Sequence, residues 1–215
     1  MTKRALVKIC GVTHSEDAAL AAQDGADFIG VIFAAQATRR VSTQAARTIA
    51  DTAAKYGAQT VGVFVEQNAG DILRLCRETG IQHAQLHGTP ARAAYGELHE
   101  KLRILFVQSP RQEAPALTPS LHPENFIVMD AGGGTGTPFE YAAFQPPIGA
   151  RWLLAGGLTP DNVAAAILTL RPHGVDVSSG VCGADPRRKD PAKVRRFLEQ
   201  VRSTDHAIRR NVSCS

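Results

Sequence analysis

Eight short apolar runs recur along this sequence, and their spacing restricts the possible folds more than any other feature. Taken as strands, they end at residues 10, 33, 65, 86, 107, 130, 155 and 178, so each ends 21 to 32 residues after the one before it. That distance is the length of one compact strand–helix unit, and parallel strands joined through such units need right-handed crossovers. The runs cover residues 5–10, 28–33, 60–65, 83–86, 104–107, 126–130, 152–155 and 174–178.

Alanine-rich stretches with helical spacing lie between most of these runs. Eight strand–helix units in 215 residues match a small α/β protein of the (β/α)8 or TIM-barrel class, whose size range begins at about 200 residues. An open doubly wound sheet is the alternative, because periodicity alone does not show that a sheet closes. The count of eight strands favours the barrel. The predicted helices cover residues 15–24, 42–56, 69–78, 91–101, 161–170 and 191–201.

Two segments interrupt the pattern. Residues 109–125 contain four prolines, so we expect the helix after the fifth strand to be degraded or replaced there. Residues 203–215 have no apolar periodicity and are expected to fray. We therefore expect a single barrel domain over residues 1–202 and a polar C-terminal tail over residues 203–215.

The charge balance gives no indication of a polyanionic partner. The chain has 24 Lys+Arg against 20 Asp+Glu, a net charge of +4. Residues 187–210 hold nine basic and three acidic residues, a surplus of six positive charges, so the rest of the chain has a net charge of −2. A basic excess confined to the last helix is usually a solvated face, so nucleic acid is not expected as a partner. No stretch approaches the roughly 18 apolar residues that a membrane-spanning helix needs, so no membrane association is expected.

Cysteine usage and the N-terminus indicate a reducing compartment. Four scattered cysteines, at positions 10, 76, 182 and 214, form neither a disulfide framework nor a CxxC pair. The N-terminal residues lack the apolar core of a signal peptide. We expect a cytoplasmic protein, with the oligomeric state open and a monomer favoured.

Two glycine turns, after the last two strand runs, indicate an anion site. Glycine lets backbone N–H groups approach a phosphate, and serine hydroxyls add donors. In a barrel, the loops after strands seven and eight commonly hold a phosphate. The structural alternative is turn chemistry alone, with Thr159 capping the next helix and Pro160 in its first turn. The candidate phosphate-binding residues are Gly156, Gly157, Ser178, Ser179 and Gly180.

Cys10 and Asp130 are candidate catalytic residues because each ends a strand run. A cysteine there can serve as a thiolate base or nucleophile, although most free cysteines are small buried apolar residues. Thr13 and Glu16, just after Cys10, have the spacing of a capping box. Asp130 follows the apolar residues 126–129 and can act as an acid, although a loop-capping aspartate before a glycine turn is about equally expected.

Polar side chains also alternate within the first and last strand runs. Asp176 lies two residues before Ser178, as Lys8 lies two before Cys10. Because successive side chains of a strand face opposite sides, these residues are expected to point inward and to pair inside the barrel.

Arginine and histidine provide further candidates. Arg39 and Arg40 follow the second strand run, where a guanidinium suits a planar carboxylate, although a solvated basic loop is equally expected. His83, Gln85 and His87 share one side of the fourth strand run, without the partners that a metal site requires. We therefore expect a polar rim at His87 and no metal.

A third glycine-rich segment, residues 132–137, is similar to a dinucleotide loop but does not meet its requirements. Thr137 stands where the third glycine is required, and no acidic residue ends the following strand run. No Walker-type GKS or GKT sequence occurs. Nucleotide and other organic cofactors are not expected.

Together these pieces closely resemble the phosphoribosylanthranilate isomerase family over roughly residues 3–201. The first and last of them are the most specific, whereas glycine turns are shared by many phosphate-binding barrels. The pieces are Lys8-Ile9-Cys10-Gly11-Val12-Thr13, Gln85-Leu86-His87-Gly88, Asp130 with Gly133-Gly134-Thr135-Gly136, Ala155-Gly156-Gly157-Leu158 and Gly174-Val175-Asp176-Val177-Ser178-Ser179-Gly180-Val181.

The resemblance implies an Amadori rearrangement of a small phosphoribosyl substrate, without metal or cofactor. On this interpretation Asp130 is the general acid that opens the sugar ring, and Cys10 is the thiolate that removes the C2 proton. Arg39 would bind the anthranilate carboxylate, His87 and Asp176 would contact the substrate, and the two glycine turns would hold the phosphate.

The chain also departs from the family pattern. Cys182 stands where the family commonly has Glu, and the loop after Asp130 is shorter than usual. The loop after the second strand run reads Ala37-Thr38-Arg39-Arg40-Val41. Because this differs from the family pattern, Arg40 is an alternative to Arg39 as the residue that binds the carboxylate. Two other functions stay open: an isomerase that also accepts the histidine-pathway aminoaldose, against which Cys10 argues, and a catalytically silent phosphate-binding barrel.

Overall fold

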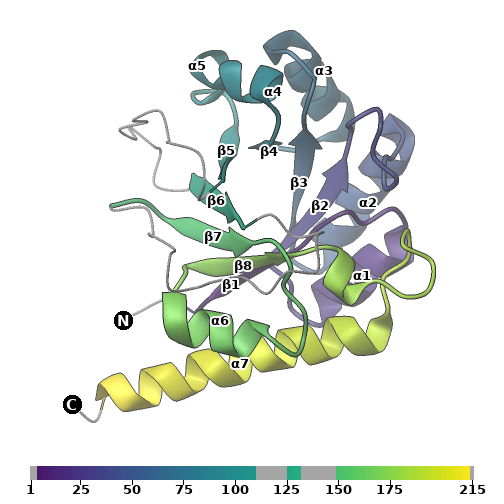
Figure 1. The fold of residues 1–215 in the computed structure, drawn as a ribbon. Coiled ribbons are helices and arrows are strands. Elements are labelled where there is room, and N and C mark those ends of the chain that lie inside the picture. Colours follow the sequence, from purple (N-terminus) through teal and green to yellow (C-terminus); the bar gives the residue numbers. More distant parts are fainter. Residues whose placement is uncertain (1–3, 110–124, 132–148, 214–215) are drawn as a thin grey trace.

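Eight parallel strands close into a barrel in chain order, β1-β2-β3-β4-β5-β6-β7-β8, with β8 pairing back to β1 (Figure 1). This computed structural model describes residues 4–109, 125–131 and 149–213. The barrel confirms the expected fold and excludes the open sheet, and each strand end lies within one residue of its prediction. The strands are β1 Leu6–Ile9, β2 Phe28–Ile32, β3 Gln59–Phe64, β4 His83–Leu86, β5 Arg103–Gln108, β6 Phe126–Asp130, β7 Trp152–Ala155 and β8 Gly174–Val177.

Strand alternation divides the apolar side chains between two cores. The smaller core fills the barrel interior with large side chains from alternate positions. Its members are Phe28, Val61, Leu105, Val107, Phe126, Val128, Leu153 and Ala155, with Leu6 packed against them. Because Leu6 and Phe126 point inward, the residues at even spacing above them on β1 and β6 point inward as well.

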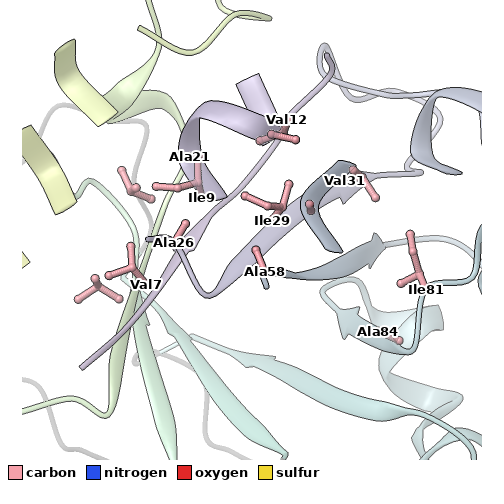
Figure 2. Close-up of a cluster of buried hydrophobic side chains, with 14 of the residues drawn as sticks. Val7, Ile9, Val12, Ala21, Ala26, Ile29, Val31, Ala58, Ile81 and Ala84 are labelled. Carbon is pink, nitrogen blue, oxygen red and sulfur yellow. The ribbon is translucent and has the colours of Figure 1, made fainter. Parts of the chain in front are cut away.

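The larger core lies between the outer face of the strands and the helices. Val7, Ile9, Ile29 and Val31 point outward from β1 and β2 toward Ala21 and other residues of this layer (Figure 2). Burial of these side chains is the main favourable contribution to folding. The helices are α1 Ser15–Gln23, α2 Thr43–Lys55, α3 Ala69–Thr79, α4 Thr89–Ala93, α5 Tyr95–Leu98, α6 Val163–Leu170 and α7 Pro191–Ser213, with the short 3-10 helix η2 Ser179–Val181.

Helix boundaries correct several local expectations. The stretch predicted as one helix over residues 91–101 forms the two short helices α4 and α5. The capping box predicted for α1 is wrong, because His14 occupies the cap position and the Thr13 hydroxyl donates to the carbonyl of Arg187 at 2.6 Å. Helix α6 starts at Val163 with Asn162 as its cap, so Thr159 does not cap it.

Several expectations fall outside the described residues. They are the irregular segment 110–124, the glycine-rich segment 132–137 and Cys214. Among the helices that the structure describes, none combines the length and apolar character needed to cross a membrane.

The C-terminal residues differ from the sequence expectation. We expected residues 203–215 to fray, but α7 continues through Ser213 along the outside of the barrel (Figure 1). Ile208 packs against the larger core, and Asp205 Oδ1 accepts a hydrogen bond from the backbone N–H of Ala5 at 3.3 Å. The apolar contact of the last turns is too sparse to appear as helical periodicity, yet it attaches them to the barrel.

Replacing Ile208 with Ala should lower the free energy of unfolding by about 1 kcal/mol, because a partly buried side chain loses apolar contact. Chemical denaturation followed by circular dichroism measures the change. The matched control is His206→Ala, an exposed position of the same helix, where the change should stay within about 0.5 kcal/mol. Equal stabilities of the two variants would show that this part of α7 does not stabilise the barrel.

Candidate active site

The candidate residues gather over the interior at the C-terminal ends of the strands. Cys10 directly follows β1 and is two residues beyond the inward-facing Lys8, while Asp130 ends β6 two residues beyond Val128 of the interior core. Because parallel strands of a closed barrel end at one face, this alternation directs Cys10 and Asp130 toward the same opening. Strands β7 and β8 lie between them in the ring.

A buried ion pair joins β1 and β8 below this opening. Lys8 and Asp176 are register partners, and Lys8 Nζ lies 2.8 Å from Asp176 Oδ2, with side chains 0% and 6% exposed. This confirms the inward pairing expected from the alternation of polar residues. The second oxygen, Asp176 Oδ1, is buried and has no hydrogen-bond partner among the described residues.

The pair keeps Lys8 charged. Burial acts to lower the pKa of Lys8, but the nearby carboxylate of Asp176 and then the Cys10 side chain raise it, and the net pKa lies above the ordinary value. Lys8 is therefore an ammonium group inside the barrel at neutral pH.

Cys10 is a buried free thiol that faces this ammonium group. Its backbone N–H donates to the carbonyl of Val177 at 2.8 Å, which extends the β1–β8 pairing beyond the strands. Opposite Cys10 on β2 stands Gly30. A Cβ atom there would lie 2.8 Å from Cys10 Sγ and 3.1 Å from Lys8 Nζ, so only glycine leaves room for both groups.

Asp130 shares the rim with His87. His87 Nε2 lies 3.9 Å from Asp130 Oδ2, and both side chains are partly exposed, at 42% and 30%. Along the same side of β4, Gln85 is buried and the His83 ring packs 5.8 Å from Phe28. His87 thus extends from the same strand to the rim, as expected.

The two glycine turns after β7 and β8 pack directly against each other. Gly156 and Gly157 have φ values of +94° and +64°, which other residues rarely adopt. Gly180 lies so close to the turn after β7 that a Cβ atom would overlap the carbonyl oxygen of Leu158. Backbone groups of both turns can therefore approach one anion together.

Ser178 ties the second turn to the end of β1. Its hydroxyl donates to the carbonyl of Cys10 at 3.0 Å, so this donor is used within the protein. We expected the Ser178 hydroxyl as an anion donor; in the structure it orients the turn, while Ser179 follows as the first residue of η2.

Arg39 lies beside this turn, and Arg40 does not. A Cβ atom at Gly11 would lie 2.7 Å from Arg39 Nε and 3.1 Å from Ser178 Oγ, so the guanidinium group is close to both residues. Arg39 Nε is buried without a hydrogen-bond partner among the described residues. Arg40 is exposed and lines a separate pocket of about 530 Å³ between α2 and α3.

Lys189 is a site residue that the sequence analysis missed. It lies within a basic run that we interpreted as solvated, yet it is only 3% exposed. Its Nζ donates to the carbonyl of Ser178 at 3.0 Å and lies 3.5 Å from Cys182 Sγ. Burial, with a smaller contribution from Arg39, lowers the pKa of Lys189 against the opposing effect of Cys182 and Cys10. No periodicity distinguishes one buried lysine in a charged run.

Comparisons with known proteins show what the chain as a whole is similar to. The family model described as N-(5'phosphoribosyl)anthranilate (PRA) isomerase matches residues 7–200. The chain is 44% identical to N-(5'-phosphoribosyl)anthranilate isomerase of Chlamydia caviae, over 94% of this chain and 99% of the relative. It is 41% identical to the chloroplastic isomerase 1 of Arabidopsis thaliana, over 94% of this chain and 77% of the relative.

Solved structures show the same similarity. Phosphoribosyl anthranilate isomerase from Thermus thermophilus superposes with a TM-score of 0.80 at 32% identity, covering 92% of this chain and 98% of that one. A phosphoribosyl anthranilate isomerase in complex with reduced 1-(o-carboxyphenylamino)-1-deoxyribulose 5-phosphate superposes with a TM-score of 0.76 at 30% identity, covering 93% and 99%.

The contact between the two turns predicts that Gly180→Ala lowers the free energy of unfolding by about 1–3 kcal/mol, because the added methyl group meets backbone that cannot move aside freely. Thermal and denaturant unfolding measure the effect. Gly183→Ala is the control, since a Cβ atom there meets only Asp190 Cβ at 4.0 Å. Equal stability of both variants would contradict the packing of the turns.

Proposed function

The chain belongs to the N-(5'-phosphoribosyl)anthranilate isomerase family, and from this premise we propose how its own residues divide the work of the reaction. The protein is an aldose–ketose isomerase of tryptophan biosynthesis. It converts N-(5-phosphoribosyl)anthranilate into 1-(2-carboxyphenylamino)-1-deoxyribulose 5-phosphate. The observation that carries the assignment of roles is the alternation that directs Cys10 and Asp130 into one opening of the barrel.

Asp130 is the general acid of the first step. Its carboxyl group gives a proton to the ring oxygen of the ribose, and the bond between that oxygen and C1 breaks. The lone pair of the anthranilate nitrogen forms the C=N bond of a protonated Schiff base. The position of Asp130 at the end of β6, partly exposed to the opening and near His87, supports this role.

Cys10 is the general base of the second step. Its thiolate takes the proton from C2, and the C–H electron pair becomes the C1=C2 double bond as the Schiff-base nitrogen is neutralised. The resulting enolamine gains a proton at C1 and loses one from the C2 hydroxyl, which yields the ketone. The sequence is redox-neutral, so acid and base groups suffice for it.

Binding residues hold the two ends of the substrate. The turns with Gly156, Gly157 and Gly180 bind the phosphate through backbone groups, with Ser178 orienting the second turn and Ser179 beside it. Arg39, whose Nε lacks a partner among the described residues, binds the anthranilate carboxylate. His87 and Asp176 contact the sugar between these ends. Two distant anchors place C1 and C2 between acid and base.

We also propose that one chain forms a complete site in a reducing cytoplasm. Every assigned residue comes from the same barrel, so no second copy is required. A base thiol at Cys10 must stay reduced to work, which suits a compartment that keeps thiols free.

Cys10→Ser and Asp130→Asn should each lower kcat/KM by about 10²- to 10⁴-fold, because each removes one proton transfer. The change in anthranilate fluorescence during turnover of freshly made phosphoribosylanthranilate measures the rate. Both variants should still bind the reduced product analogue, because its anchors are intact. Asp51→Asn, at an exposed position of α2, is the matched control. Near-normal turnover in either site variant would remove that residue from its role.

Arg39→Met should raise KM about tenfold or more with a smaller change in kcat, because a charge-assisted hydrogen bond to the substrate carboxylate is lost. Steady-state kinetics with the same fluorescence signal separate KM from kcat. Arg40→Met, which removes an exposed guanidinium group one residue away, should leave both constants near wild type. The reverse pattern would assign the carboxylate to Arg40.

A further inference from the structure

We propose that the buried ion pair of Lys8 and Asp176 sets the ionisation of Cys10, with the Lys8 ammonium stabilising the thiolate and the Asp176 carboxylate limiting that effect. Lys8 and Asp176 thus act as positioning residues for charge. The inference rests on the proposed role of Cys10 as the base, and it identifies what prepares the thiol for that role.

The geometry places all three groups on one inward-facing ladder. Lys8 and Cys10 are two residues apart on the same side of the β1 chain, and Asp176 is the register partner of Lys8 on β8. A Cβ atom placed on Gly30 would lie 3.1 Å from Lys8 Nζ and 2.8 Å from Cys10 Sγ. The ammonium nitrogen and the thiol sulfur therefore lie within about 6 Å of each other. Opposite charges at such separations favour the charged forms of both groups.

The surroundings strengthen this effect. Lys8 is completely buried and Asp176 nearly so, which places the pair in a medium where charges interact more strongly than in water. Burial acts to lower the pKa of Lys8, but Asp176 and then the Cys10 side chain raise it above its ordinary value.

Other charged groups also act on Cys10. Lys189 lies in the segment before α7, where burial lowers its pKa while Cys182 and then Cys10 act in the opposite direction. Arg39, from the loop after β2, lies against Gly11 next to Cys10. On β2 itself the facing residue is Gly30, which carries no charge. Lys8 differs from Lys189 and Arg39 because it is completely buried and held in place by a register partner.

The opposite signs of the two charges give a specific test. The pH dependence of Cys10 alkylation by iodoacetamide, followed by mass spectrometry of the Cys10 peptide in the intact folded protein, reports the thiolate directly. Lys8→Met should move the midpoint of this curve up by about one to three pH units, and Asp176→Asn should move it down. The control Lys193→Met removes an exposed lysine that donates to the carbonyl of Cys182, and it should leave the midpoint unchanged.

A double variant keeps the test decisive if Lys8→Met fails to fold with Asp176 left unpaired. Lys8→Met/Asp176→Asn buries no charge at either position. It should fold, with its midpoint above that of the wild type but below that of Lys8→Met. A wild-type midpoint in the double variant, or no shift in a folded Lys8→Met, would overturn the inference.

Kinetics distinguish this electrostatic role from a structural one. Asp176→Asn is the reference for the double variant, because both variants lack the Asp176 carboxylate that is assigned to the sugar. Relative to this reference, the rising limb of kcat/KM in the double variant should lie at higher pH, as the alkylation midpoint does, and the two activities should converge at high pH. A difference between the two variants by one factor at every pH would indicate a purely structural role of Lys8 and would contradict the inference.

The inference and the proposed function fail in different ways. Normal turnover in Cys10→Ser would disprove the role of Cys10 as the base, whereas the alkylation midpoints would still decide whether the ion pair sets its ionisation. An inactive Cys10→Ser combined with an unchanged midpoint in Lys8→Met and in the double variant would overturn only the inference.

Discussion

Closure of the barrel between β1 and β8 is the constraint on which the rest of the structure depends. Register pairing there places Lys8 beside Asp176, and the same ladder carries Cys10 and Ser178 at its upper end. A charged pair taken out of water stabilises little by itself, because desolvation opposes the attraction. Its value in this barrel is positional, since it holds one ammonium and one carboxylate beneath the thiol.

Two glycines matter for the site because they have no side chain. Gly30 leaves space in which Lys8 and Cys10 approach each other, and Gly180 lets the turn after β8 lie against Leu158 in the turn after β7. Both are close approaches of groups that any side chain would separate. Cys10 and the two glycine turns therefore lie at neighbouring strand ends with little room for adjustment, which suits the proposed roles, because these depend on placing a substrate between fixed groups.

Sequence reasoning predicted the strands within one residue because buried strands are short apolar runs whose signal is local. It was less successful where the deciding contact is distant in the chain. The Thr13 hydroxyl donates to Arg187 and does not cap α1, and Lys189 is buried under the Ser178 turn despite its basic neighbours. Helix α7 extends through Ser213 because a few contacts such as Ile208 attach it to the barrel.

The order of apolar runs and glycine turns was enough to predict that the chain repeats a strand–helix unit and that its candidate site residues lie at strand ends. The motifs at Cys10, Asp130 and the last two turns also indicated the family. Only the tertiary structure decided that the sheet closes, that Arg39 lies beside the Ser178 turn while Arg40 lines a separate pocket, and that Lys189 is buried under that turn. The physical reason is that burial and charge pairing depend on which residues meet across the ring, and residues 168 positions apart, such as Lys8 and Asp176, meet only when the fold is complete.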